Sequence, residues 1–303
     1  MDLNKYQLKY KFHRRYLLSL KDLNDEEIAE LICLAREYKY KRVVHEQSTV
    51  LKNKYVLLIT KPRFPQTGIT FEISVKELGG SPVVSAMNGE DIENRLADEY
   101  YVKALSTVGL SAIMISTSKV SDTEIFEKTV NLPVINANTD CSPCQALSAL
   151  LTIFEICHSF TGLKVTLAGN FKVDDNSLLY GLIKLGADVT LLTTENGEPE
   201  EEIIEYCSQF TDLKITKDKK VALKGADIVC IGSGDKDNPL NLTADDLLVA
   251  SPSVKVLTPV PVDYTVADKS VFKKDETPVL KQAENLIHVY KAVLTALAGK
   301  KTI

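Results

Sequence analysis

The feature that most constrains the fold of this chain is the alternation of short apolar runs with segments whose apolar residues have helical spacing. Near-continuous apolar runs are typical of parallel strands that helices cover on both faces. The runs form two series, before and after a long helical pattern that begins at Pro143. The first series is "YVLLIT", "PVVSA", "AIMIST" and "PVINA", and the second is "VTLAG", "DVTLL", "LKIT", "DIVCIG" and "VKVLTP". The sequence therefore predicts an α/β protein with two doubly wound parallel-sheet domains.

Helix starts are marked by capping patterns. Asn24 and Glu27 have the spacing of a capping box ahead of an amphipathic segment. In "SPCQ", Ser142 is expected at the N-cap, Pro143 at the first helical position and Gln145 at the third, with its side chain reaching back to the cap.

The composition excludes several classes of protein. The chain has 303 residues, of which 45% are hydrophobic and 25% charged, enough to bury a large core in two domains. A net charge of −5 without a basic stripe argues against a nucleic-acid partner or an anionic membrane surface. A polar N-terminus and the lack of an 18-residue apolar run predict a cytoplasmic protein, and the 6 scattered cysteines fit a reducing compartment.

Ligands of doubly wound sheets bind beyond the carboxyl ends of the strands, so the loops there are where chemistry is expected. These loops are 61–68, 116–122, 138–145, 169–176, 231–238 and 258–263.

The first of these loops, "KPRFPQTG", has the position of a phosphate-binding loop, where backbone N–H groups and a positive helix end can meet an anion. Lys61 and Arg63 add positive charge. Phe64 and Pro65, however, replace small polar donors, and proline has no N–H. The favoured interpretation is a remnant in which Phe64 fills the phosphate space; the alternative is that Lys61 and Arg63 still recruit an anion.

Other motifs favour structural interpretations. "CSPC" lacks a second Cys/His pair at metal spacing, and "GSG" at 232–234 lacks the third glycine and the acid of a dinucleotide site, so we expect no metal and no cofactor. His288 on the last helix is expected to be a satisfied structural histidine rather than a general base. Asp174, Asp175 and Asn176 precede a helix and are expected to cap it, although the acids could also meet an amino-acid ammonium group.

Several motifs together identify a family resemblance that covers nearly the whole chain. In order and spacing, "TGITFEISVKELGG", "LPVINANTDCSPCQALSALLTIFE", "LAGNFKVDDNSLLYGLIKLGADVTLLT", "KGADIVC", "LTPVP" and "QAENLIHVYKAVL" resemble the aspartate and ornithine carbamoyltransferases. The resemblance implies the carbamoyltransferase fold, with domains at 1–142 plus 279–303, which would bind carbamoyl phosphate, and at 143–278, which would bind the amino acid. It also implies two joining helices at 143–160 and 278–299, and a homotrimer.

The family's working residues are mostly absent on the donor side. The phosphate loop of the family reads Ser-Thr-Arg-Thr-Arg, and here the matching positions run from Phe64 to Gly68, with Thr67 retained. A family arginine after the third strand corresponds to Ser116, and the histidine of the His-Pro-Cys-Gln motif corresponds to Ser142.

The acceptor side shows similar losses. The aspartate of the family's Asp-x-Trp loop falls at Gly232, and the chain has no tryptophan. The ornithine-type His-Cys-Leu-Pro motif falls on residues 258–261, and the arginine of the Gln-Ala-Glu-Asn-Arg motif becomes Leu286.

These losses suggest a family member without the standard activity, which would serve as a sensor of a small amino acid or anion, as a regulatory partner of a true transferase, or as a structural trimer. The alternative is an amino-acid transferase with a changed donor or acceptor. The candidate ligand-binding residues are Lys61, Arg63, Gln66, Thr67, Gln145, Asp174 and Asp175.

Overall fold

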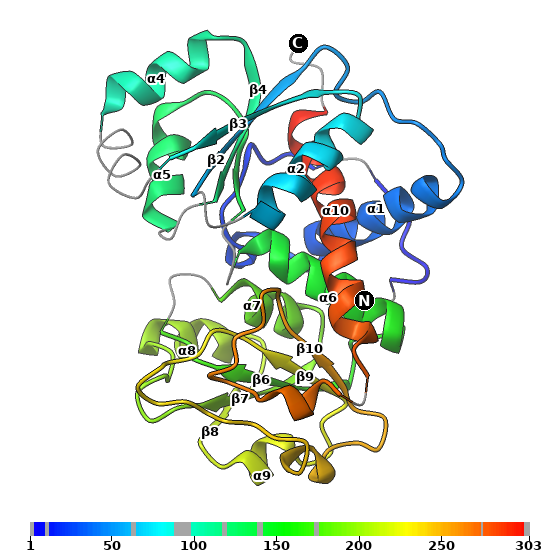
Figure 1. Cartoon of the computed structure of the whole chain (residues 1–303), viewed down its shortest axis with the longest axis vertical. Coiled ribbons are helices and arrows are strands. Elements are labelled where there is room, and N and C mark those ends of the chain that lie inside the picture. The colour runs from blue at the N-terminus through cyan, green and yellow to red at the C-terminus, as the bar shows by residue number, and fades with distance from the viewer. Residues whose placement is uncertain are drawn as a thin grey trace.

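The computed structural model describes residues 3–9, 12–61, 65–87, 98–116, 120–137, 142–172, 176–273 and 275–299. It contains two α/β domains, one above the other in Figure 1, each built on a parallel sheet. Helices α6 and α10 run between them. The structure confirms the predicted fold class.

The first sheet has the strand order β1-β5-β4-β2-β3. Helix α2 packs against α10, while α4 and α5 help to cover the other face, where Val102 and Phe126 are fully buried. The elements are β1 Tyr16–Leu17, β2 Tyr55–Thr60, α2 Pro65–Glu77, β3 Ser81–Ala86, α4 Glu99–Thr107, β4 Leu110–Ser116, α5 Val120–Thr129 and β5 Val134–Asn136.

The second sheet has the order β10-β9-β6-β7-β8, so β6 lies at its centre. The chain reverses its direction of progress across the sheet beside β6, and this is the point where doubly wound sheets place their ligand crevice. The elements are β6 Lys164–Gly169, α7 Ser177–Lys184, β7 Asp188–Thr193, α8 Glu201–Ser208, β8 Lys214–Thr216, α9 Lys219–Leu223, β9 Ile228–Ile231, η2 Asp246–Val249, β10 Lys255–Leu257 and η3 Lys269–Val271.

A layer of helices joins the two sheets and holds much of the largest hydrophobic core. It consists of α1 Asp25–Val43, α6 Pro143–Cys157 and α10 Thr277–Ala298, with the short η1 Leu20–Asp22 ahead of α1. The two predicted joining helices are confirmed, although α6 ends at Cys157 because His158 takes a left-handed conformation. Both bonds of the predicted capping box at Asn24 and Glu27 are present.

The structure corrects the interpretation of His288. This side chain on α10 is 0% exposed, but neither ring nitrogen has a hydrogen-bond partner among the described residues. Burial, and next the neighbouring charges of Lys291 and Lys39, lower its pKa to about 3. His288 is therefore a buried neutral histidine, and the expectation of a satisfied one is wrong.

This pKa makes a testable contribution to stability. The pKa of His288 is 6.5 in the unfolded chain and about 3 in the folded protein. Between pH 6.5 and pH 3 the unfolded state therefore binds more protons than the folded state does. Because of this difference, the free energy of unfolding decreases as the pH falls through 6.5. From pH 7 to pH 5 we expect a loss of about 2 kcal/mol from this one group. Urea unfolding at both pH values should show that His288→Phe removes this part of the pH dependence. The exposed His13→Phe variant is the control, and an unchanged dependence in His288→Phe would contradict the prediction.

Candidate functional site

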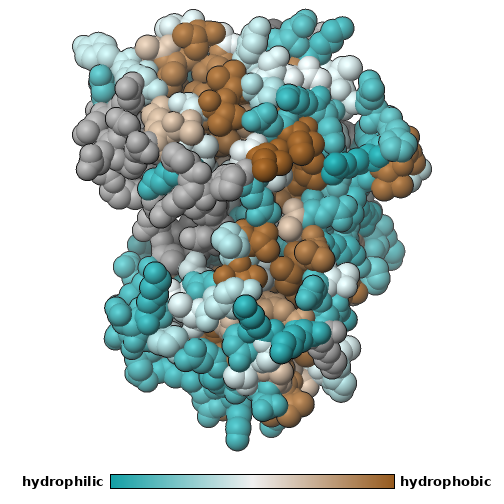
Figure 2. All heavy atoms as spheres, in the orientation of Figure 1, coloured by the Kyte–Doolittle hydropathy of each residue, from teal (hydrophilic) through white to brown (hydrophobic). Residues whose placement is uncertain are grey.

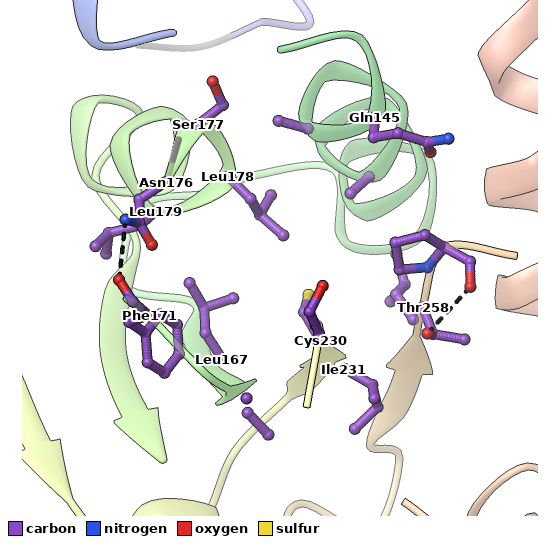
Figure 3. Close-up of a pocket in the computed structure, with 18 of the residues that line it drawn as sticks. Gln145, Leu167, Phe171, Asn176, Ser177, Leu178, Leu179, Cys230, Ile231 and Thr258 are labelled. Carbon is purple, nitrogen blue, oxygen red and sulfur yellow. Dashed lines mark hydrogen bonds between the residues drawn. The ribbon is translucent and has the colours of Figure 1, made fainter. Parts of the chain in front are cut away.

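A pocket of about 80 Å³ lies at the carboxyl ends of β6, β9 and β10, under the first turns of α6 and α7. Its wall is mainly apolar, and Figure 3 shows Leu178 of α7 extending into the space between the helices and the strand ends. The apolar wall includes Ala146, Ala149, Leu167, Leu178, Leu179, Ile231 and Leu257. The location agrees with the crevice expected for a doubly wound sheet.

The floor of the pocket depends on a close approach of two backbone segments. A Cβ atom on Gly169 would lie 2.7 Å from the carbonyl oxygen of Ser233, so only glycine fits there without a shift of the backbone. The Asn170 N–H donates to that same carbonyl at 2.8 Å, and the Gly232 N–H donates to Ala168 at 2.9 Å. These contacts tie the ends of β6 and β9 together and fix the shape of the pocket.

Several polar side chains of the wall are already bonded within the protein. The Ser142 hydroxyl accepts from the Gln145 N–H at 3.2 Å and caps α6, as predicted, but the Gln145 side chain makes no return bond to the cap, so the expectation of a full capping box is wrong. The Ser177 hydroxyl accepts from the Leu20 N–H at 2.9 Å, which connects α7 to η1. These groups stabilise the fold and are less available to a ligand.

Asn176 also bonds within the protein, and the expectation that its side chain caps α7 is wrong. It occupies the N-cap position of α7, but its side chain makes no capping bond. Its amide donates instead to the Phe171 carbonyl at 3.3 Å, while the Thr258 hydroxyl donates to the Pro259 carbonyl at 3.2 Å (Figure 3).

Two glutamines differ from these residues. Gln145 of α6 and Gln282 of α10 line the pocket, and neither side-chain amide has a hydrogen-bond partner among the described residues. Gln282 is only 3% exposed, and its Oε1 atom is buried. The pocket also contains Cys230, but burial raises the pKa of this thiol to about 12, so it remains protonated and is a poor nucleophile.

The structure places the predicted site residues in different surroundings. Gln145 lines the pocket, whereas Lys61, Gln66 and Thr67 do not. Lys61 follows β2 and is half-buried, as is Gln66 in the first turn of α2. Thr67 is 4% exposed, and its hydroxyl is hydrogen-bonded to that of the buried Tyr290.

Three predicted site residues, Arg63, Asp174 and Asp175, lie outside the described residues, as do Phe64 and Cys141. Gln282 is a pocket residue that the sequence motifs did not indicate. The available signal was a polar residue on a helix whose other inward positions are largely apolar.

A larger cavity of about 670 Å³ lies between the segment that precedes α1 and helices α7 and α8. Two of the cations in its wall are paired within the protein: Arg14 bonds Glu27 at 2.8 Å and Lys21 bonds Glu202 at 3.1 Å. The pocket at the strand ends is the stronger candidate for a ligand site, because it lies where doubly wound sheets bind their ligands.

Within the described part of the chain, no cluster of three or more His, Cys, Asp or Glu side chains could hold a metal ion. Cys144 is buried, and its thiol contacts the Asn136 carbonyl at 3.5 Å. Among the same residues, no helix is long and apolar enough to cross a membrane.

Comparison with known proteins gives the same family along both domains. Residues 15–155 match the family model "Aspartate/ornithine carbamoyltransferase, carbamoyl-P binding domain", and residues 161–297 match "Aspartate/ornithine carbamoyltransferase, Asp/Orn binding domain". Ornithine carbamoyltransferase of Nostoc punctiforme is 30% identical over 94% of this chain and 97% of its own length. The corresponding protein of Methanosarcina acetivorans is 30% identical over 94% and 99%.

The fold is also similar to solved structures. The ornithine carbamoyltransferase of Pyrococcus furiosus aligns with a TM-score of 0.84 at 27% identity, over 94% of this chain and 97% of that one. The motifs, the two parallel sheets and the matches along both halves agree, and the chain belongs to the aspartate/ornithine carbamoyltransferase family.

Proposed function

We propose that this member of the family does not transfer a carbamoyl group from carbamoyl phosphate to ornithine or aspartate, and that it acts as a sensor, a regulatory partner of a true transferase, or a structural relative. One observation carries the proposal. Uncharged side chains occupy the positions where the family motifs have charged or carbonyl-polarising side chains, and several of them are buried or hydrogen-bonded within the protein. Residues 1–142 with 279–303 would form the donor-side domain, and residues 143–278 the acceptor-side domain.

The donor side supports the proposal at three positions. Thr67, the retained residue of the phosphate loop, is buried and bonded to Tyr290. Ser116, in place of an arginine, is 0% exposed at the end of β4. Ser142, in place of the histidine that contacts the carbamoyl oxygen, is 1% exposed and caps α6. None of these groups can supply positive charge to a dianion.

The acceptor side supports it as well. Leu286, in place of the family arginine, is 2% exposed and belongs to the largest hydrophobic core. Gly232 replaces an aspartate at the edge of the pocket, and no charged side chain is among the described residues that line it. An amino acid with two charged groups would find no counter-charge there.

The energetic consequence is large. A charge-assisted hydrogen bond contributes roughly 1.5–3 kcal/mol. Loss of two phosphate-facing arginines, a serine donor and the polarising histidine removes on the order of 5–10 kcal/mol of transition-state stabilisation, or ~10⁴-fold or more in rate.

A second candidate function is amino-acid transfer with a changed donor or acceptor. The observation in its favour is that Lys61 follows β2 directly and α2 begins four positions later at Pro65, so a cation precedes a helix N-terminus. Lys61, Arg63, Gln66 and Thr67 would then hold a different anion.

The activity assay separates these functions. With carbamoyl phosphate and either ornithine or aspartate, we expect no citrulline and no carbamoyl-aspartate, because the groups that stabilise the transition state are missing. The matched control is the ornithine carbamoyltransferase of Pyrococcus furiosus, assayed under conditions where it is active. Turnover within a hundredfold of that control would refute the proposal, and turnover only with another anionic donor would support the second candidate.

We also propose a homotrimer. Apolar side chains are exposed on α2 and on the edge strand β3: Ile69 is 61% exposed, Val83 41% and Val84 40%. Figure 2 shows hydrophobic groups over α2 and beside the neighbouring strands. An exposed edge strand with apolar side chains favours association with another chain.

Three chains of 33.5 kDa would give a particle of roughly 100 kDa. Light scattering at micromolar concentration should give this mass, and Val83→Lys should lower it because it places a charge in the contact. Val221→Lys, at a position on α9 that is 62% exposed in the other domain, is the control. A monomeric wild-type protein would contradict the proposal.

A further inference from the structure

The segment that precedes α1 is bonded to the second domain, although it directly follows a strand of the first sheet. We propose that residues 18–23 form a strap that ties the edge of the first sheet to α7 and α8 and limits rotation of the two domains relative to each other. The strap is a conformational feature of the fold and does not depend on whether the protein transfers a carbamoyl group.

One end of the strap is fixed to the first sheet. Leu17 ends β1 and pairs with Ile135 of β5. The side-chain amide of Asn136 donates to the carbonyl of the next residue, Leu18, at 2.9 Å. Asn136 is 0% exposed and ends β5, so the strap leaves the sheet from a fixed point.

The other end is fixed to α7 by Lys184, which lies in the last turn of this helix. Its ammonium group donates to the backbone carbonyls of Leu20 at 2.8 Å, Lys21 at 2.7 Å and Leu23 at 2.6 Å. A lysine ammonium group has three N–H donors, so the strap uses all of them. The end of the strap is therefore held by a charged donor at three consecutive carbonyl contacts.

Further bonds from α7 and α8 hold the same residues. The Leu20 N–H donates to the Ser177 hydroxyl at 2.9 Å, and the Tyr206 hydroxyl of α8 donates to the Lys21 carbonyl at 3.0 Å. The Leu20 side chain is 0% exposed and belongs to the largest hydrophobic core. The backbone of η1 is thus built into the second domain.

The two anchors lie very close together along the chain. Only Ser19 separates Leu18, which is bonded to the first sheet, from Leu20, which is bonded to α7. An extended chain spans at most about 3.6 Å per residue, so the Cα atoms of the two anchored residues cannot be more than roughly 7 Å apart. A larger separation would break the bonds at one anchor. Helices α6 and α10 also connect the domains, and a third connection leaves less freedom for rotation.

The distance between two spin labels, one on each domain, measures this freedom directly. Tyr100→Cys on α4 and Val221→Cys on α9 provide attachment sites that are 82% and 62% exposed. Cys141→Ser and Cys157→Ser are included, because the other four cysteines are buried. Labelled chains are diluted in excess unlabelled protein before assembly, so that only distances within one chain are measured. We expect one narrow distance distribution.

Lys184→Met removes the three donors and keeps an unbranched apolar side chain. We expect the width of the distance distribution to increase about twofold or more, because the strap then opens at its second anchor. Lys214→Met is the matched control, since this lysine lies on β8 of the same domain and bonds the Asp188 side chain at 3.0 Å on the surface. Its distribution should equal that of the protein with Lys184 and Lys214 intact.

Ser177→Ala/Tyr206→Phe removes two other bonds to the strap and serves if Lys184→Met does not fold. An unchanged width in a folded Lys184→Met or Ser177→Ala/Tyr206→Phe protein would overturn the proposal. A distribution that is already broad with the strap intact, or equal broadening in Lys214→Met, would also refute it.

Discussion

The packing of α6 against α10 holds the two α/β domains together. Helix α6 leads from the first sheet to the second, and α10 returns from the second sheet to pack beside α1 and α2. Polar bonds set the register of the contact: Ser148 donates to Gln282 at 2.6 Å, and the Asn285 amide donates to Thr152 at 2.9 Å. A buried polar group without its partner costs about 1–3 kcal/mol, so a shifted register would be penalised at each of these bonds.

The chemistry of the pocket follows from the same contact. The register that satisfies Ser148 and Asn285 places Gln145 and Gln282 among the residues that line the pocket, while β6 and β9 close the floor at Gly169. Leu286, which the motif resemblance sets against a family arginine, lies in the core. The chain has kept the scaffold of a transferase family and has a crevice whose described lining carries no charge.

Much of the fold could be predicted from the sequence, because strand and helix signals are local. The apolar runs gave the strands from β2 to β10, and the capping residues Asn24 and Ser142 marked two helix starts. Strand β1 could not be found, since two residues carry no periodicity and its only described pairing is with the distant β5. The place of Gln282 in the pocket wall and the missing partners of His288 depend on contacts between helices far apart in the chain, which no local pattern contains.

We propose that the donor side does not bind the phosphate dianion, and thermal or chemical unfolding in the presence of carbamoyl phosphate measures this affinity. A ligand at ~100-fold excess over its dissociation constant would add about 2.7 kcal/mol to the free energy of unfolding. Wild type and a Lys61→Ala/Arg63→Ala variant should be compared at matched ionic strength, with phosphate and pyrophosphate as further anions. We expect no stabilisation of either protein by any of the three anions. Stabilisation of the wild type that is absent from the double variant would contradict it.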